Sequence, residues 1–359
     1  MRSVHGAADA AKGGGREEIT GAVTSVRAFV LTRYGGPDAM ELRDVPKPSP
    51  GAGEVLVRVR AAGLNPVDYK TRQGMLRPIR RYRLPIVAGS DLSGVIEAVG
   101  AGVSKFAVGD RVFGRVGMEK LGAFAEFAAA SEDLFARMPP ALDFVKAGGV
   151  PIAGLTVLQA LRDELHVARG QRIFISGGAG GVGTFALQLA KWLGAEVATT
   201  ASPRGAALVR RLGAEVVVDY TRERFEEVLH DYDGALDLVG GETLMKTFRV
   251  VKRGVKVVSV AGMPDPSTAK DLDGGALLAA MFWVASFRIR RAARRHGVSY
   301  RYLFMHASGA ELSELAELIE QGKVRVVIDR VFAFEHIAEA MAYLEQGHAK
   351  GKVVVEMAE

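Results

Sequence analysis

The stretch that decides the fold runs from Arg172 to Arg204 and reads RIFISGGAGGVGTFALQLAKWLGAEVATTASPR. Its centre, residues 178–183, has the spacing G-x-G-x-x-G. A short apolar strand precedes this motif, an amphipathic helix pattern follows it, and a second strand begins at Glu196. The motif is a specific structural signal only when it occurs in this strand–turn–helix–strand order. The stretch therefore predicts a βαβ unit of a doubly wound α/β domain.

The glycines of this motif point to an anion-binding turn. Glycine allows a tight turn with positive φ, and the missing side chains let backbone N–H groups approach a pyrophosphate. The following helix directs its positive end at the same anion. A plain turn does not need so many glycines, so we interpret the loop as a dinucleotide cradle. The predicted contacts are Gly178, Ala179, Gly180, Gly181 and Val182.

The second strand indicates which dinucleotide is bound. Sites for NAD usually carry an acidic residue about 20 residues after the motif begins, where it binds the ribose 2′-hydroxyl. No carboxylate lies between Val197 and Arg204; Thr200, Ser202 and Arg204 offer hydroxyls and a cation instead. Tyr220, at the end of the next strand, adds a phenol. This set suits a 2′-phosphate, so NADP(H) is the predicted cofactor.

Strand and helix patterns divide the chain into three parts. Residues 1–26 lack the apolar core of a secretory signal and are predicted to be a disordered tail. Short strands separated by Gly and Pro fill residues 27–150, and alternating strands and helices fill residues 151–306. Residues 307–359 are expected to return to the first domain. A cleft between the domains is the expected meeting place of cofactor and substrate.

Composition excludes several classes of protein. The chain has no cysteine, which rules out disulfides and thiolate zinc sites and is typical of a reducing, cytoplasmic location. No apolar run reaches the roughly 20 residues of a membrane span, so no membrane partner is expected. The net charge of +6 is concentrated in residues 288–302, which we interpret as a solvated helix face rather than a nucleic-acid surface.

Several motifs together resemble a known family, the medium-chain dehydrogenase/reductase superfamily. The similarity is to its zinc-free quinone oxidoreductase and alkenal/enone reductase branch, and the GHAKGK ending resembles the reticulon-4-interacting-protein-like subgroup. The resemblance implies a GroES-like β-rich catalytic domain, a Rossmann domain with a parallel sheet, and a homodimer. The motifs are GLNPVDYKTRQG (63–74), PIVAGSDLSGVIEAVGAGV (85–103), VGDRVFG (108–114), GAFAEF (122–127), AGLTVLQAL (153–161) and GHAKGKVV (347–354).

Departures from the zinc-dependent members of that superfamily are equally informative. They have a cysteine where this chain reads Asn65, and Gly-His-Glu where it reads Gly89-Ser90-Asp91. Asp91 alone cannot hold zinc, which takes about four ligands. The sequence therefore predicts no metal, and hydride transfer from the cofactor to a quinone or to the β-carbon of an α,β-unsaturated carbonyl.

The resemblance also implies where the site residues lie. Asn65, Tyr69 and Lys70 are the catalytic candidates, because the matching family motif faces the nicotinamide. Asn65 is expected to bind cofactor or substrate, and Tyr69 and Lys70 to stabilise the developing enolate, although a helix-surface pair is an equal alternative for them. The resemblance implies further cofactor contacts from Thr156, Phe304, Met305 and Lys352, with core packing as the alternative for Phe304 and Met305. Val239, Gly240, Ala261 and Gly262 are expected to contact the cofactor because they end two predicted parallel strands.

Three functions remain open on sequence alone. The first is an NADPH-dependent quinone or enone reductase, and the second applies the same hydride chemistry to an enoyl thioester. The third is a non-catalytic NADPH-binding sensor or a crystallin-like protein on the same scaffold. The segment 271–302 departs from the βαβ rhythm. Its apolar half is expected to cover the active site or form a dimer contact, and its basic half to attract acidic substrates such as a CoA thioester.

Overall fold

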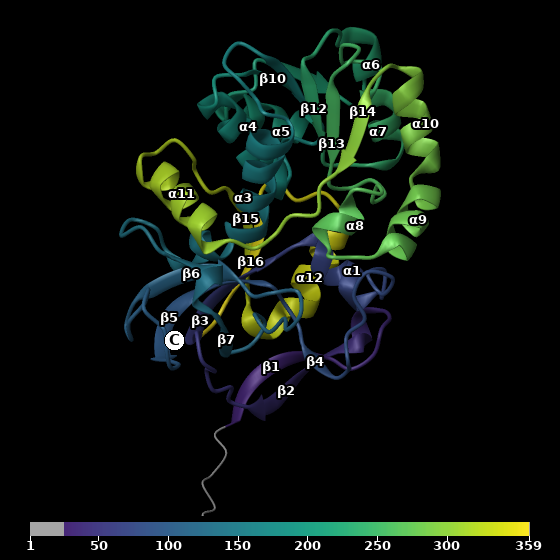
Figure 1. Cartoon of the computed structure of the whole chain (residues 1–359). Coiled ribbons are helices and arrows are strands. Elements are labelled where there is room, and N and C mark those ends of the chain that lie inside the picture. Colours follow the sequence, from purple (N-terminus) through teal and green to yellow (C-terminus); the bar gives the residue numbers. More distant parts are fainter. Residues whose placement is uncertain (1–24, 359) are drawn as a thin grey trace, which may run out of the picture.

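The computed structural model describes residues 25–358 and contains two large sheets, one above the other in Figure 1. The first strand, β1 (Ser25–Leu31), includes Ser25 and Val26, so the last two residues of the predicted disordered tail are part of a strand. The rest of the predicted tail lies outside the described residues.

The upper sheet has six parallel strands in the order β11-β10-β9-β12-β13-β14. The order reverses direction between β9 and β12, which is the doubly wound arrangement that places ligands at the carboxyl ends of the strands. The α/β fold predicted from the glycine motif is confirmed. The strands are β9 (Arg172–Ile175), β10 (Glu196–Ala201), β11 (Val216–Asp219), β12 (Gly234–Asp237), β13 (Lys256–Ser259) and β14 (Ser299–Tyr302).

Helices cover both faces of this sheet (Figure 1). The helix after the glycine motif, α4 (Gly181–Trp192), packs its buried residues from Gly183 to Ala190 between β9 and β10 and the apolar helix α3 (Pro151–Leu158). A π-helical turn at Gln159–Glu164 continues α3. The remaining helices are α5 (Pro203–Arg211), α6 (Phe225–Val228), α7 (Gly241–Thr247), α8 (Thr268–Asp271), α9 (Ala276–Ala285) and α10 (Phe287–Arg295).

The lower, GroES-like sheet has seven strands and combines distant parts of the chain. Its order is β15-β16-β3-β5-β6-β8, with β7 paired to β3. The late strands β15 and β16 lie beside the early strand β3, the yellow strands among the blue ones in Figure 1. The strands are β3 (Glu54–Leu64), β5 (Asp91–Val99), β6 (Arg111–Arg115), β7 (Phe127–Ser131), β8 (Phe135–Arg137), β15 (Ile328–Ala333) and β16 (Lys352–Glu356).

Shorter elements complete the lower domain. A small sheet has the order β2-β1-β4, and α1 follows β3 directly. The last helix, α12, packs beside β16 and α1. The elements are β2 (Met40–Pro46), β4 (Ile86–Val87), α1 (Pro66–Arg72), α2 (Phe144–Gly148), α11 (Gly309–Glu320) and α12 (Ile337–Glu345).

One expectation about local structure is corrected by the structure. The basic segment 288–302 is not a helix face throughout, because α10 ends at Arg295 and β14 begins at Ser299. Gly297, at φ +70°, turns the chain out of the helix. Val298 is buried, and β14 pairs in parallel with β13 as the last strand of the sheet. Only the part before His296 keeps the predicted helical form.

Candidate functional site

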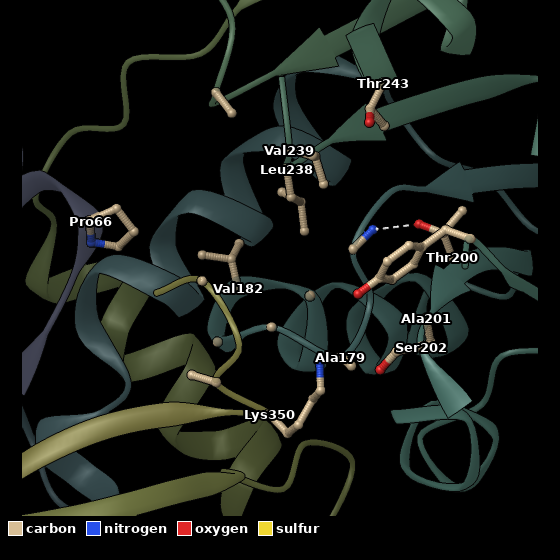
Figure 2. Close-up of a pocket in the computed structure, with 18 of the residues that line it drawn as sticks. Pro66, Ala179, Val182, Thr200, Ala201, Ser202, Leu238, Val239, Thr243 and Lys350 are labelled. Atoms are coloured by element: carbon tan, nitrogen blue, oxygen red, sulfur yellow. Dashed lines mark hydrogen bonds between the residues drawn. The ribbon is translucent and has the colours of Figure 1, made fainter. Parts of the chain in front are cut away.

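A cavity of about 700 Å³ opens between the two sheets. The glycine motif forms one wall, α1 and the end of β3 form another, and the segment that leads into β16 closes a third side. Figure 2 shows Val182, Ala179 and Lys350 around this space, with Leu238 and Val239 at the ends of the Rossmann strands. The cavity therefore lies at the carboxyl edge of the parallel sheet, where a dinucleotide fold binds ligands.

The glycine motif is shaped by close backbone approaches. A Cβ on Gly183 would lie 2.4 Å from the carbonyl oxygen of Gly177. In contrast, a Cβ on Gly180 would meet only that oxygen, at 3.5 Å, so Gly180 leaves open space on the cavity side. Helix α4 starts at Gly181 with no side-chain cap, so its first-turn N–H groups are free to bind an anion. The loop fits a pyrophosphate.

Two threonines at the end of β10 hold this loop in place. The Thr200 hydroxyl accepts a hydrogen bond from the Gly177 amide at 3.0 Å (Figure 2), and the Thr199 hydroxyl accepts one from the Gly178 amide at 3.0 Å. Thr200 also lines the cavity. Its hydroxyl hydrogen is still available to donate, because the hydroxyl acts as acceptor in the loop contact.

The region expected to select the nucleotide is only partly assembled. Thr200, Ser202 and Tyr220 line the cavity, whereas Arg204 is exposed and does not. Lys350 is a cation that our sequence analysis did not select, and it extends toward Ala179 of the glycine motif in Figure 2. Its Cδ would lie 3.7 Å from a Cβ on Gly205, in the first turn of α5. Its position in the motif GHAKGK, next to Gly351, was the available signal.

A buried polar network forms the floor of the cavity beneath α1. The Lys352 ammonium donates to the Asn65 side-chain oxygen at 2.5 Å and to the Leu64 carbonyl at 3.0 Å. The Asn65 amide nitrogen donates to Asp91 Oδ2 at 2.9 Å. Asn65 thus links a buried cation to a buried carboxylate.

Two further buried charges complete this network. Asp68 accepts a hydrogen bond from the Asn65 backbone amide at 2.7 Å, and Asp91 also accepts one from the amide of Ile152. Arg115 contributes a nearby positive charge and contacts the sulfur of Met305 at 3.1 Å. The pKa of Asp68 is raised to about 7, mainly by burial. The hydrogen bond that Asp68 accepts from the Asn65 amide opposes this shift, and the charge of Asp91 adds to it. Burial also raises the pKa of Asp91 and lowers that of Lys352.

Helix α1 presents the two remaining catalytic candidates to the cavity. Tyr69 and Lys70 both line it, and so do Asn65 and Lys352. Burial raises the pKa of Tyr69, which keeps the phenol protonated and able to donate a hydrogen bond. Burial lowers the pKa of Lys70. The structure therefore gathers all three catalytic candidates, although both polar atoms of the Asn65 side chain are already engaged.

Only some of the other predicted cofactor contacts line the cavity in the structure. Val239 and Ala261 line the cavity together with Ala179, Gly180, Gly181 and Val182. Thr156 is buried in α3, and the backbone amide of Gly240 is bonded to Asp237. The predicted residues outside the cavity lining are Thr156, Gly178, Arg204, Gly240, Gly262, Phe304 and Met305.

The donor set does not fit a zinc ion. Among residues 25–358, no three His, Cys, Asp or Glu side chains gather in a way that could hold a metal. At Asn65, where the zinc-dependent enzymes have a cysteine, the Lys352 ammonium is bonded. A zinc ion at that point would be repelled at close range by the positive charge of Lys352. No step of the chemistry is therefore assigned to a metal.

Comparison with known proteins gives a consistent result. The "Alcohol dehydrogenase GroES-like domain" model matches residues 51–140, and the "Zinc-binding dehydrogenase" model matches residues 212–355. The chain is 35% identical to "NADPH-dependent alkenal/one oxidoreductase, chloroplastic" of Arabidopsis thaliana, across 92% of this chain and 79% of the relative. It is 34% identical to "NAD(P)H oxidoreductase RTN4IP1, mitochondrial" of Danio rerio, across 94% and 92%.

Solved structures agree. The quinone oxidoreductase from Coxiella burnetii superposes with a TM-score of 0.82 at 32% identity, covering 93% of this chain and all of that one. With the GroES-like sheet, the doubly wound sheet and relatives at this level of identity, the chain belongs to the medium-chain dehydrogenase/reductase superfamily, alongside its alkenal and quinone oxidoreductases.

Proposed function

We propose that the protein is a zinc-independent oxidoreductase that uses NADPH to reduce a quinone or the carbon–carbon double bond of an α,β-unsaturated carbonyl. The observation that carries this proposal is one cavity lined both by the glycine motif and by Tyr69 and Lys70. NADPH supplies the hydride when it is bound. The relatives named as NADPH-dependent alkenal and quinone enzymes support the same chemistry.

The residues of this chain divide the work between binding and charge stabilisation. The free N–H groups of α4 bind the pyrophosphate, and the cavity wall at Ser202, Tyr220 and Lys350 receives the 2′-phosphate. Negative charge develops on the acceptor's carbonyl oxygen during reduction, and a positioned donor lowers that barrier. Tyr69 and Lys70 are the donors we assign to that oxygen.

Asn65 has a different role in this proposal. Its side-chain oxygen and nitrogen are bonded to Lys352 and Asp91, so it is a positioning residue rather than a ligand of the substrate. It is the N-cap residue of α1, and thereby fixes the direction in which that helix presents Tyr69 and Lys70.

A panel of acceptors tests the function. NADPH oxidation is followed with 9,10-phenanthrenequinone, with an alkenal and with a crotonyl thioester. We expect turnover with the quinone or the alkenal. In a matched pair of variants, Tyr69→Phe should lose activity and Tyr34→Phe should keep it. Turnover confined to the thioester would identify an enoyl-thioester reductase. NADPH binding without any turnover would identify a sensor, and tighter binding of NADH would contradict the cofactor assignment.

Two further predictions concern assembly and location. We infer a homodimer and a cytoplasmic location, as expected from the sequence. Among residues 25–358, no helix has both the length and the apolar character needed to cross a membrane. Light scattering coupled to size-exclusion chromatography measures the oligomeric state, and fractionation of the source cells measures the location.

A further inference from the structure

Helices α9 and α10 form a nearly continuous rod along the edge of the nucleotide-binding domain (Figure 1). Helical hydrogen bonds run across the joint at Ser286, whose amide donates to Phe282 and whose carbonyl accepts from Arg290, both at 2.9 Å. No residue of the segment 271–302 lines the cavity. The apolar half of this segment therefore does not cover the site, which was one of the expectations from sequence.

One side of this rod is buried and the opposite side is exposed. Phe282, Ser286 and Ala293 face the protein. Residues at spacings of three and four lie on one face of a helix, so a stripe can be followed along the outward side. We define the α9–α10 stripe by six exposed residues in this register, Leu277, Met281, Val284, Arg288, Arg291 and Arg295.

The stripe changes character halfway along. Its first half is apolar and unusually open, with exposed fractions of 87% for Leu277, 40% for Met281 and 68% for Val284. Trp283 and Phe287 flank it and are also exposed, at 51% and 43%. A contiguous apolar patch of this kind on a folded protein marks an interaction surface.

The second half of the stripe is uncompensated positive charge. Residues 274–298 contain no Asp or Glu. Arg290 is occupied, because its guanidinium bonds the Trp283 carbonyl at 2.8 Å and stacks over the Trp283 ring. Within residues 25–358, no hydrogen bond or ion pair engages the side chains of Arg288, Arg291 or Arg295.

We propose that the α9–α10 stripe docks on the surface of a bilayer that contains anionic phospholipids. Leu277, Met281 and Val284 enter the boundary between headgroups and acyl chains, where amphipathic helices bind, and the arginines contact lipid phosphates. A second copy of the chain fits less well. A two-fold interface sets a surface against itself, and residues 274–298 contain no acid that could pair with the arginines across such an interface. This surface revises the expectation of no membrane partner: the protein lies on the bilayer and does not span it.

Vesicle binding tests the proposal with the full chain. Co-sedimentation is measured with phosphatidylcholine vesicles and with vesicles in which about one third of the lipid is phosphatidylserine. We expect binding only to the anionic vesicles, and a loss of most of it between about 0.05 and 0.5 M NaCl. In a Trp192→Phe background Trp283 is the single tryptophan, because the chain has two, and its emission should shift to the blue on binding.

Two pairs of variants separate the apolar and charged halves. Leu277→Asp with Val284→Asp should abolish binding, and Arg288→Gln with Arg291→Gln should weaken it about 10- to 30-fold, given the contribution of each basic residue near an anionic surface. The matched control is Arg210→Gln with Arg211→Gln on α5, which removes the same charge from another exposed helix and should change binding less than threefold. All these variants should keep the wild-type NADPH oxidation rate, since none of the residues lines the cavity.

Three results would overturn the proposal. The first is no binding of the wild-type protein to anionic vesicles, and the second is an equal loss in the α5 control. The third is a wild-type dimer that Leu277→Asp with Val284→Asp converts to a monomer without any vesicle binding, which would assign the stripe to a second copy of the chain.

Discussion

The cavity has two walls that are built in opposite ways. The glycine wall, residues 177–183, comes from one continuous stretch of the chain. Its geometry depends on the absence of side chains at its glycines. The polar floor is built from Asn65, Asp68, Asp91, Arg115 and Lys352, which come from separate parts of the chain and carry charge into the interior. The first wall is specified locally, whereas the second exists only after the lower sheet has formed.

The largest expected effect tests how strictly the glycine wall is specified. Gly183→Ala places a methyl group 2.4 Å from the Gly177 carbonyl oxygen, which the backbone cannot accommodate without moving. We expect the free energy of unfolding to fall by about 4 kcal/mol and NADPH binding to be lost. Urea unfolding and fluorescence titration measure the two effects.

Gly180→Ala is the matched control for that substitution. Its methyl group has room at 3.5 Å, so stability should change by less than about 1 kcal/mol. Cofactor binding should still weaken, because the methyl group stands where the pyrophosphate approaches. If both variants unfolded equally easily, the loop would not be shaped by the close approach at Gly183.

The polar floor should respond to the loss of a single charge. Lys352→Met removes the donor to Asn65 and Leu64 and takes one of the two buried cations, Lys352 and Arg115, away from Asp68 and Asp91. Breaking a buried charge pair in this way costs about 3 to 5 kcal/mol. The double variant Lys352→Met with Asp91→Asn should recover part of that loss, as a double-mutant cycle of unfolding free energies would show.

A surface lysine provides the comparison. Lys105 pairs with Asp133 in an exposed ion pair, and such pairs contribute about 0 to 1 kcal/mol. Lys105→Met should therefore change stability by less than about 1 kcal/mol. A similar cost for Lys105→Met and Lys352→Met would contradict the special position of the buried network.

The pH dependence of stability should contain a contribution from Asp68 of the polar floor. The pKa of Asp68 is about 7 in the folded protein, against about 3.9 in an unfolded chain. Between these values the folded state holds a proton that the unfolded state has released. The contribution of Asp68 to stability should therefore fall as the pH rises through this window, by at most about 1.4 kcal/mol per pH unit, and stay level above it.

Asp68→Asn isolates this contribution. The variant should lose the Asp68 part of the slope, while Asp91, whose pKa burial also raises, keeps a slope of the same sign. The difference between the two stability curves is the measurement. Stability that rises with pH between about 4 and 7 in that difference curve would contradict the assignment.

The smallest expected effect concerns the rim of the glycine wall. Lys350 lines the cavity and Arg204 does not. Lys350→Gln should weaken NADPH binding about tenfold, while Arg204→Gln should weaken it less than about threefold, because exposed charges are screened. Binding of NADH should change less in both variants. A larger effect at Arg204 would favour the interpretation made from sequence alone.

The contrast between the two walls also explains which parts of the fold and of the site could be predicted from the sequence. The βαβ unit was predictable because its strand, turn and helix are neighbours in the chain, and the structure confirms it. The partnership of Asn65, Asp91 and Lys352 was not, because no periodic pattern records which distant residues meet. Asp91 was considered only as a zinc ligand and rejected as one, and strand β14 was missed because residues 288–302 were interpreted as a helix face.

The position of β16 has a consequence for biosynthesis. This strand lies between β15 and β3, and its Lys352 bonds to Leu64, 288 residues earlier in the chain. A nascent chain that has already released the whole doubly wound sheet from the ribosome still has an open edge on β3. The two domains therefore differ in when they can be completed, because the polar floor needs β16, which follows the doubly wound sheet in the chain.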